Sequence, residues 1–190
     1  ILGLSVPPTQ EYALSNSGLS FSSYSLDEFK ALDADNKKGY TCYLTDLYKN
    51  DKSKLLHIVN ETGFLTLDFS TIESLELEEF NLTSLNLSSC QNLSSIEGIQ
   101  SLTTLNSLAL NGCQNLSSLE KIQHLTHLSS LNLNGCQNIS SLEGVQNLTN
   151  LNSLTLSGCQ NISSLEGVQH LTNLNSLSLS GCQNLKSLEI

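Results

Sequence analysis

Hydrophobic residues recur with a fixed period from Leu82 to the end of the chain. Within one unit, Ile139 to Cys159, apolar side chains first stand three residues apart, and the spacing then falls to two at Leu154 and Leu156. A spacing of two predicts a β-strand, because alternate side chains of a strand point to opposite faces. A spacing of three differs from the 3.6 of an α-helix and predicts 3₁₀ turns or extended chain. Each unit is therefore predicted to be a short strand followed by a tight return.

The unit occurs five times, and each copy carries a Cys-Gln-Asn triplet at an interval of 23 residues. A single unit cannot bury its own row of leucines, whereas stacked copies can share a continuous core, so the period predicts a solenoid. The cysteines that open the triplets are Cys90, Cys113, Cys136, Cys159 and Cys182.

Leu154, Leu156 and the following Cys159 resemble a leucine-rich repeat in its cysteine-bearing form, and the return segment from Leu142 resembles the short repeats of internalin-type bacterial proteins. The next apolar residue, Ile162, follows the cysteine by three positions instead of the commoner two, which accounts for the period of 23. The resemblance covers residues 82–190. It implies an α/β solenoid: a right-handed coil with a parallel sheet on the concave face, a convex side that is mostly 3₁₀ or extended, and a small helical N-terminal cap.

Stacking turns each repeated residue into a column. We interpret the cysteine column as structural, because buried thiols pack as small apolar groups with a weak donor. Metal or disulfide chemistry is the alternative, but strands about 4.8 Å apart hold parallel Cβ atoms farther apart than the ~3.8 Å of a disulfide. The glutamate column (Glu97, Glu120, Glu143, Glu166 and Glu189) is expected to lie in solvent. The asparagine column is expected to cap the corner by bonding to backbone; it comprises Asn92, Asn115, Asn138, Asn161 and Asn184.

The chain before the repeats divides into an irregular lead-in (residues 1–24) and a cap with helices and a hairpin (residues 25–81), and the five repeats, the last incomplete, fill residues 82–190. Ser25 and Glu28 have the spacing of a capping box, which predicts a helix start. Residues 41–60 predict one or two helices with a break at Asn50 and Asp51. The segments 64–69 and 73–78 alternate like strands and predict either a hairpin or an irregular first coil that closes the open end.

All ten Phe and Tyr residues lie before residue 81, where a terminal cap must cover the first coil. We therefore expect them to pack the cap, and the alternative is a binding patch built from some of the tyrosines. The segment Asp33 to Gly39 has the look of a calcium loop, but Lys37 stands at a ligand position and the glycine comes one residue late, so we expect no calcium there.

A net charge of −10, with eight lysines and no arginine, argues against nucleic acid and anionic membranes as partners. No apolar run approaches the ~18 residues of a membrane span. Six cysteines without a disulfide-like spacing indicate reduced thiols, and hence a cytoplasmic protein or one delivered into a host cytosol. The chain begins at Ile1 and contains no methionine, so we expect the native start, and any signal peptide, to lie upstream.

We expect no catalytic residue, cofactor or metal site. Cys42 and His57 could form a nucleophile and base, but no activating motif surrounds them. His124 and His170 share a column two coils apart, about 10 Å, which is too far for one zinc ion. No phosphate loop or paired-carboxylate motif is present.

The family resemblance implies protein recognition, and concave solenoid faces are common binding surfaces. We predict a monomeric protein–protein interaction module, of a bacterial protein that binds host proteins. The alternatives are the substrate-recognition arm of a larger enzyme, such as a ubiquitin ligase, and a structural spacer. The concave face consists of the strand side chains that point away from the leucines, and it is small, polar and uncharged. Its predicted partner-binding residues are Asn86, Ser88, Asn111, Asn132, Asn134, Thr155, Ser157, Ser178 and Ser180.

Overall fold

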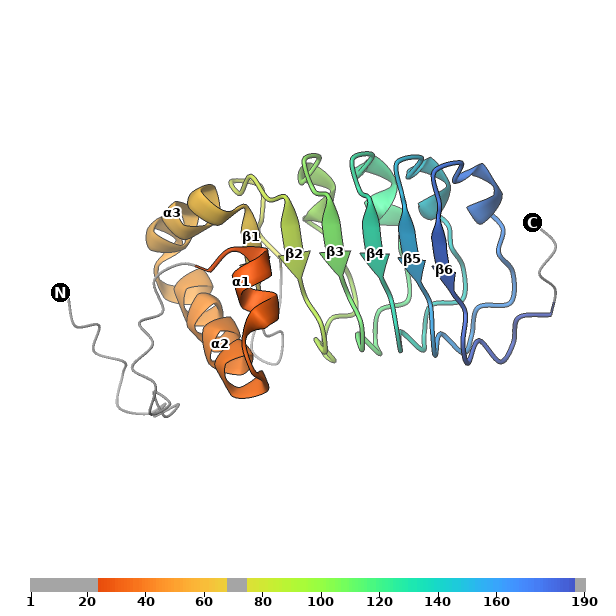
Figure 1. The fold of residues 1–190 in the computed structure, drawn as a ribbon, viewed down its shortest axis with the longest axis horizontal. Helices are drawn as coiled ribbons and strands as arrows, with labels where there is room; N and C mark the ends of the chain where they lie inside the picture. The colour runs from red at the N-terminus through yellow and green to blue at the C-terminus, as the bar shows by residue number, and fades with distance from the viewer. Residues whose placement is uncertain (1–23, 68–74, 187–190) are drawn as a thin grey trace.

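The computed structural model describes residues 24–67 and 75–186. Its repeats stack into one parallel sheet with one strand per coil, in the order β1-β2-β3-β4-β5-β6, and the chain advances from one coil to the next along the row of strands (Figure 1). Sheet and family resemblance agree: this is an open solenoid with a helical N-terminal cap. The strands are β1 (Phe64–Thr66), β2 (Ser84–Asn86), β3 (Ser107–Ala109), β4 (Ser130–Asn132), β5 (Ser153–Thr155) and β6 (Ser176–Ser178).

The first coil is shorter than the others. From β2 onward, each strand residue pairs with the residue 23 positions later in the chain, as Leu108 does with Leu131. In contrast, β1 pairs in parallel with β2 by joining Phe64 to Ser84, an offset of 20. A parallel partner is what a coil provides, and an antiparallel hairpin does not, so β1 belongs to an irregular first coil. Of the second strand-like segment, residues 75–78 have no strand assignment and residues 68–74 lie outside the described residues.

The return segments contain the tight turns that the three-residue spacing predicts. Three of the four begin after a glycine in the left-handed region, such as Gly144 at φ +95°. At the same position the second of these returns has Lys121, and its 3₁₀ turn is five residues long instead of three. The turns are η1 (Ile99–Ser101), η2 (Glu120–His124), η3 (Val145–Asn147) and η4 (Val168–His170).

Several columns of apolar side chains, most of them leucine, fill the space between the sheet and the returns. The central strand residues Leu108, Leu131 and Leu154 are each at most 1% exposed, and burying a leucine side chain stabilises a fold by about 1.5–3 kcal/mol. The core continues without interruption from the cap to the fifth coil and thins at the last one, where Leu177 and Leu179 are only partly buried. The shared core is therefore the main source of stability.

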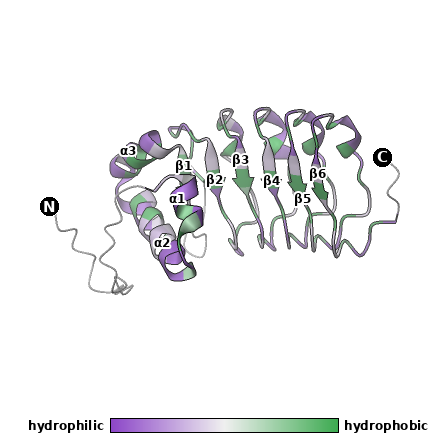
Figure 2. Ribbon diagram, viewed as in Figure 1, coloured by the Kyte–Doolittle hydropathy of each residue, from purple (hydrophilic) through white to green (hydrophobic). Residues whose placement is uncertain are grey.

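The cap consists of three helices whose starts are fixed by side chains: α1 (Leu26–Ala31), α2 (Ala34–Asn50) and α3 (Lys52–Thr62). Ser25 and Glu28 form the expected capping box on α1. Asp33, which we considered as part of a calcium loop, instead accepts the Asn36 N–H and caps α2. Asp51 marks the expected break, ending α2 and capping α3. Hydrophobic and hydrophilic residues share each helix, as amphipathic packing requires (Figure 2).

Aromatic residues join the cap to the first strand. The rings of Phe29 and Phe64 lie 5.0 Å apart, and Tyr40 and Tyr48 are buried. Their hydroxyls accept backbone N–H groups of Tyr24 and Glu76. Burial raises the pKa of both tyrosines. These two tyrosines therefore pack the cap, as expected, and do not form an exposed patch.

Candidate functional site

The concave face is held in register by the sheet. Asn86, Ala109, Asn132 and Thr155 follow one another as directly paired residues of neighbouring strands, and Ser178 continues the column. The side chains of the next column are linked across coils: Ser88 Oγ donates to Asn111 Oδ1 at 2.6 Å, and Ser157 N–H donates to Asn134 Oδ1 at 2.9 Å. The structure thus brings the predicted binding residues onto one continuous surface. All of them are half-buried except Ser180, which is exposed.

The cap closes one end of this face. All three residues of β1 are buried, although Phe64 and Thr66 occupy the columns that face outward in later strands. Phe29 of α1 packs on Phe64, and the Oγ1 of Thr41 in α2 lies 3.1 Å from the Oγ1 of Thr66. The open surface therefore begins at β2.

A pocket of about 470 Å³ lies where the cap meets the concave face. On one side it is lined by the predicted binding residues Asn86 and Ser88. On the other it is lined by α2, whose contribution includes Lys37, Lys38 and Cys42. Sequence reasoning missed the two lysines because it judged their segment only as a calcium loop. The available signal was their spacing to Thr41 and Cys42, since residues four apart share one helix face. The remaining lining residues are Phe29, Thr41, Thr66, Leu67 and Ser89.

The five cysteines form a ladder along the inner edge of the coils. Each thiol donates to the carbonyl of a leucine in the preceding coil, for example Cys136 Sγ to Leu110 O at 3.0 Å and Cys159 Sγ to Leu133 O at 3.0 Å. None of the six cysteines is in a disulfide; four of the ladder members are buried and Cys182 is half-buried. Burial raises the pKa of Cys136 to about 11 and that of Cys159 to about 12. Thiols that stay protonated are poor nucleophiles and metal ligands.

The asparagine column contributes less to the corner than we expected. Asn115 donates to Gln91 O at 2.7 Å. The other four members of the column are exposed and make no hydrogen bond to any residue that the structure describes. The ties between coils come from another column, in which Asn150 donates to Thr126 O at 2.8 Å and Asn173 to Thr149 O at 2.7 Å. In the sequence the first column is asparagine in every repeat, whereas the second has Thr104 and His127 before Asn150 and Asn173, so only the coil geometry shows which amides reach a carbonyl.

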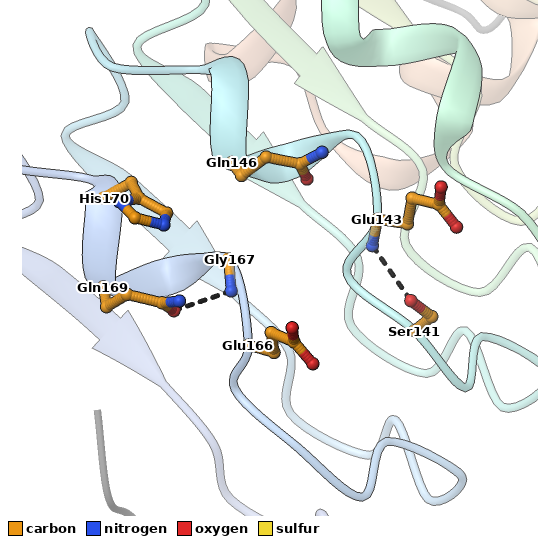
Figure 3. Close-up of a pocket in the computed structure, with 7 residues that line it drawn as sticks. All are labelled: Ser141, Glu143, Gln146, Glu166, Gly167, Gln169 and His170. Atoms are coloured by element: carbon orange, nitrogen blue, oxygen red, sulfur yellow. Dashed lines mark hydrogen bonds between the residues drawn. The ribbon is translucent and has the colours of Figure 1, made fainter.

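A second hollow, of about 370 Å³, lies on the convex side between two returns. Its polar groups hold the turns: Ser141 Oγ accepts the Glu143 N–H, and Gln169 Oε1 accepts the Gly167 N–H (Figure 3). Glu143 and Glu166 are exposed, as expected for the glutamate column. Lys121 Nζ lies 3.1 Å from Glu97 Oε1 and offsets the repulsion along that column. The hollow is thus a feature of the turns.

Among the residues that the structure describes, no hydrogen bond joins the candidate nucleophile Cys42 to the candidate base His57. Cys42 lies on α2 in the pocket, whereas His57 lies on α3 with its Nε2 3.4 Å from Glu61 Oε1. Across residues 24–67 and 75–186, no three His, Cys, Asp or Glu side chains are grouped to hold a metal ion. None of the helices in those ranges is long and apolar enough to cross a membrane.

One strand per coil, 3₁₀ returns and a thiol ladder define a leucine-rich-repeat solenoid, a fold that typically serves as a non-catalytic scaffold for protein binding. The model of the BspA-type leucine-rich repeat region matches residues 68–186 in six copies, and the chain belongs to that family. The match has one copy more than the five units marked by cysteines, in line with the irregular first coil. A comparison with curated protein sequences finds no match.

Solved structures support the same fold. The leucine-rich-repeat domain of the type III effector XopL is 27% identical over 72% of this chain and 49% of its own, with a TM-score of 0.60. A leucine-rich-repeat protein of Leptospira interrogans is 26% identical over 61% of this chain and 30% of its own, with a TM-score of 0.53. The functional domain of InlJ from Listeria monocytogenes, which includes a cysteine ladder, is 22% identical over 73% of this chain and 31% of its own, also with a TM-score of 0.53. The chain therefore spans less than half of each of these structures.

Proposed function

We propose that this chain is a protein-binding module whose concave face is the docking surface, and that it belongs to a bacterial protein that meets host proteins. The observation that carries the binding surface is the row of half-buried side chains from Asn86 to Ser178, polar except at Ala109, which ends in a pocket at the cap. The likeness to a type III effector domain supports the bacterial part of the proposal. Buried thiols outside any disulfide fit a reducing compartment such as a host cytosol.

Photo-cross-linking tests the docking surface directly. We would place a benzophenone amino acid at Ser130 on the concave face and, as a matched control, at Ser140, an exposed serine on the return. Incubation with host-cell lysate and irradiation should give discrete cross-linked bands from the concave probe and none from the control. Arginine at Asn132 and Asn134 should then abolish those bands while leaving the circular-dichroism spectrum in place, because arginine blocks the face without entering the core. The melting temperature should fall slightly, because the backbone N–H groups of Asn134 and Ser157 lose their amide acceptors.

The two alternatives have separate signatures. A structural spacer would give no cross-link from the concave probe, and the same cross-links with and without arginine at Asn134 would also exclude this face. A recognition arm of a larger enzyme, such as a ubiquitin ligase, uses the same binding surface next to a catalytic domain. A full-length reading frame with a cysteine-bearing domain after residue 190 would favour that arrangement.

A further inference from the structure

The asparagine side chains of the concave face are turned in one sense. Asn86 Oδ1 accepts the Ser88 N–H at 3.0 Å, Asn132 Oδ1 accepts the Asn134 N–H at 3.1 Å, and Asn134 Oδ1 accepts the N–H of a residue in the next coil at 2.9 Å. A backbone N–H can only donate, so the atom facing it must be the amide oxygen. The orientation of these three amides is therefore fixed by the backbone.

Because each amide oxygen faces a backbone N–H, the amide nitrogen of the same side chain points away from that N–H. Among residues 24–67 and 75–186, Nδ2 of Asn86, Asn132 and Asn134 has no hydrogen-bond partner, and each side chain is half-buried at the bottom of the face. Each Nδ2 carries two N–H donors. The backbone carbonyls of the strands are already engaged in the sheet. At these three positions the face thus offers donors that the protein leaves unused, and they are complementary to a ligand rich in acceptors.

The two lysines at the cap end of the face also favour a ligand with acceptor groups, because they are positively charged. Within the described residues, neither Lys37 nor Lys38 lies within ion-pair distance of a carboxylate, whereas Lys52 pairs with Glu76 and Lys121 with Glu97. Among the described residues that line the pocket with Lys37 and Lys38, none carries a carboxylate. In a chain with a net charge of −10, this is a local site for an anionic group beside a row of neutral donors.

We propose that the concave face binds an acidic, extended peptide segment of the partner protein, with a carboxylate in the pocket between Lys37, Lys38 and Asn86, and with peptide carbonyls on the amides of Asn132 and Asn134. This inference rests on the proposed function. Strands spaced about 4.8 Å apart place β2 and β5 about 14 Å apart, the length of roughly four extended residues. Two lysines on an acidic chain suit one or two carboxylates and are too few for a nucleic-acid backbone.

Fluorescence polarisation with defined peptides tests the charge preference. The probes are a fluorescein-labelled octapeptide of alternating Glu and Gly and its Gln-Gly counterpart. We expect the Glu peptide to bind at least tenfold more tightly at 50 mM NaCl, and several-fold more weakly at 200 mM NaCl, because the contact is partly electrostatic. K37E with K38E should lose the preference. K49E is the matched control, since Lys49 is exposed on the same helix outside the pocket, and it should bind as the wild type does.

Asn134→Asp tests the donors at nearly constant shape. The new carboxylate still accepts the Ser157 N–H but has no donor to offer and adds a negative charge, so the Glu peptide should bind more than tenfold more weakly while the melting temperature changes little. The uncharged Gln peptide senses mainly the lost donor, and its binding should weaken less. Cys42 adds a readout of position, because it lines the pocket while the buried ladder thiols are shielded. With alkylation resolved residue by residue by mass spectrometry, the Glu peptide should slow the reaction of Cys42 with iodoacetamide and the Gln peptide should not.

Equal binding of the two peptides, no binding of either, or unchanged binding by the K37E/K38E variant would overturn the acidic-peptide assignment. Tighter binding of heparin or polyphosphate than of the Glu peptide would also overturn it, by indicating general attraction of polyanions. The concave cross-links from Ser130 are independent of these outcomes. If they persist while the peptide preference fails, the docking surface stands and only its chemistry is wrong.

Discussion

The thiol of Cys136 has a hydrogen-bond acceptor for its proton and no water for its ionised form. Its Sγ donates to Leu110 O in the preceding coil, and its side chain is 0% exposed. Burial therefore raises its pKa to about 11, and burial raises that of Cys159 to about 12, from an ordinary value of 9.0. The pKa of Cys113 is raised as well, mainly by a hydrogen bond with the Cys90 side chain and secondly by burial. At neutral pH the ladder is a row of protonated thiols that ties one coil to the next.

These shifts predict a loss of stability in alkali. A thiol whose pKa is raised in the folded state keeps a proton that the unfolded chain gives up above about pH 9. The free energy of unfolding should therefore fall between about pH 9 and pH 11, by up to about 1.4 kcal/mol per pH unit for each thiol, and should not change from this cause below pH 9. Urea unfolding under reducing conditions would measure it. C136A should start less stable at pH 8 and decline less steeply by about that amount.

A second variant separates this linkage from simple destabilisation. L131A removes core packing and keeps every thiol, so its decline above pH 9 should run parallel to that of the wild type. Tyr40 and Tyr48, whose pKa values burial also raises, contribute equally to all three proteins. If C136A declined as steeply as the wild type, the ladder would not be the source of the alkaline loss.

Among the elements, those set by local pattern could be predicted from the sequence and those set by long-range packing could not. The two-residue spacing at Leu154 and Leu156 predicted β5, and the capping box at Ser25 predicted the start of α1. The place of β1 was not evident, because its coil is three residues short and lacks the repeat's cysteine. The pocket was missed for a related reason: its lysines and Asn86 are about 50 residues apart in the chain, and only the packing of α2 on β1 brings them together.

The turn glycines give a matched pair for an element-level prediction. Gly144 and Gly167 occupy the same position in successive coils, with φ +95° and +97°, but a Cβ at the first would lie 2.5 Å from Leu119 O and at the second 3.5 Å from its nearest neighbour. Both alanine variants should lose about 1 kcal/mol or more from the left-handed backbone. G144A should lose clearly more, because the obstructing atom is backbone and cannot move aside cheaply. Chemical denaturation of the two variants measures the difference, and equal losses would contradict the steric argument.

On the scale of the whole molecule, the two ends of the solenoid differ. The first strand is covered by α1 and α2, and all its residues are buried. At the other end β6 pairs only with β5 among the described strands, and its leucines are partly buried. In a solenoid each coil contacts only its neighbours, so stability is roughly a sum of coil and interface terms. The 190-residue chain should therefore open from β6 and remain closed longest near the cap.

Leu131 and Leu177 occupy the same position in β4 and β6, and they test this gradient. L131A removes a side chain that is 1% exposed and should cost about 2–5 kcal/mol, because the cavity lies between two complete coils. L177A should cost less than half as much, since part of that side chain is already in water. Hydrogen–deuterium exchange should show the same order, with the amides of β2 to β4 protected longest and those of β6 exchanging first. Equal losses for the two variants, or uniform exchange from β2 to β6, would mean that the coils unfold as one unit. The concave face could then not loosen at one end while it holds a peptide at the other.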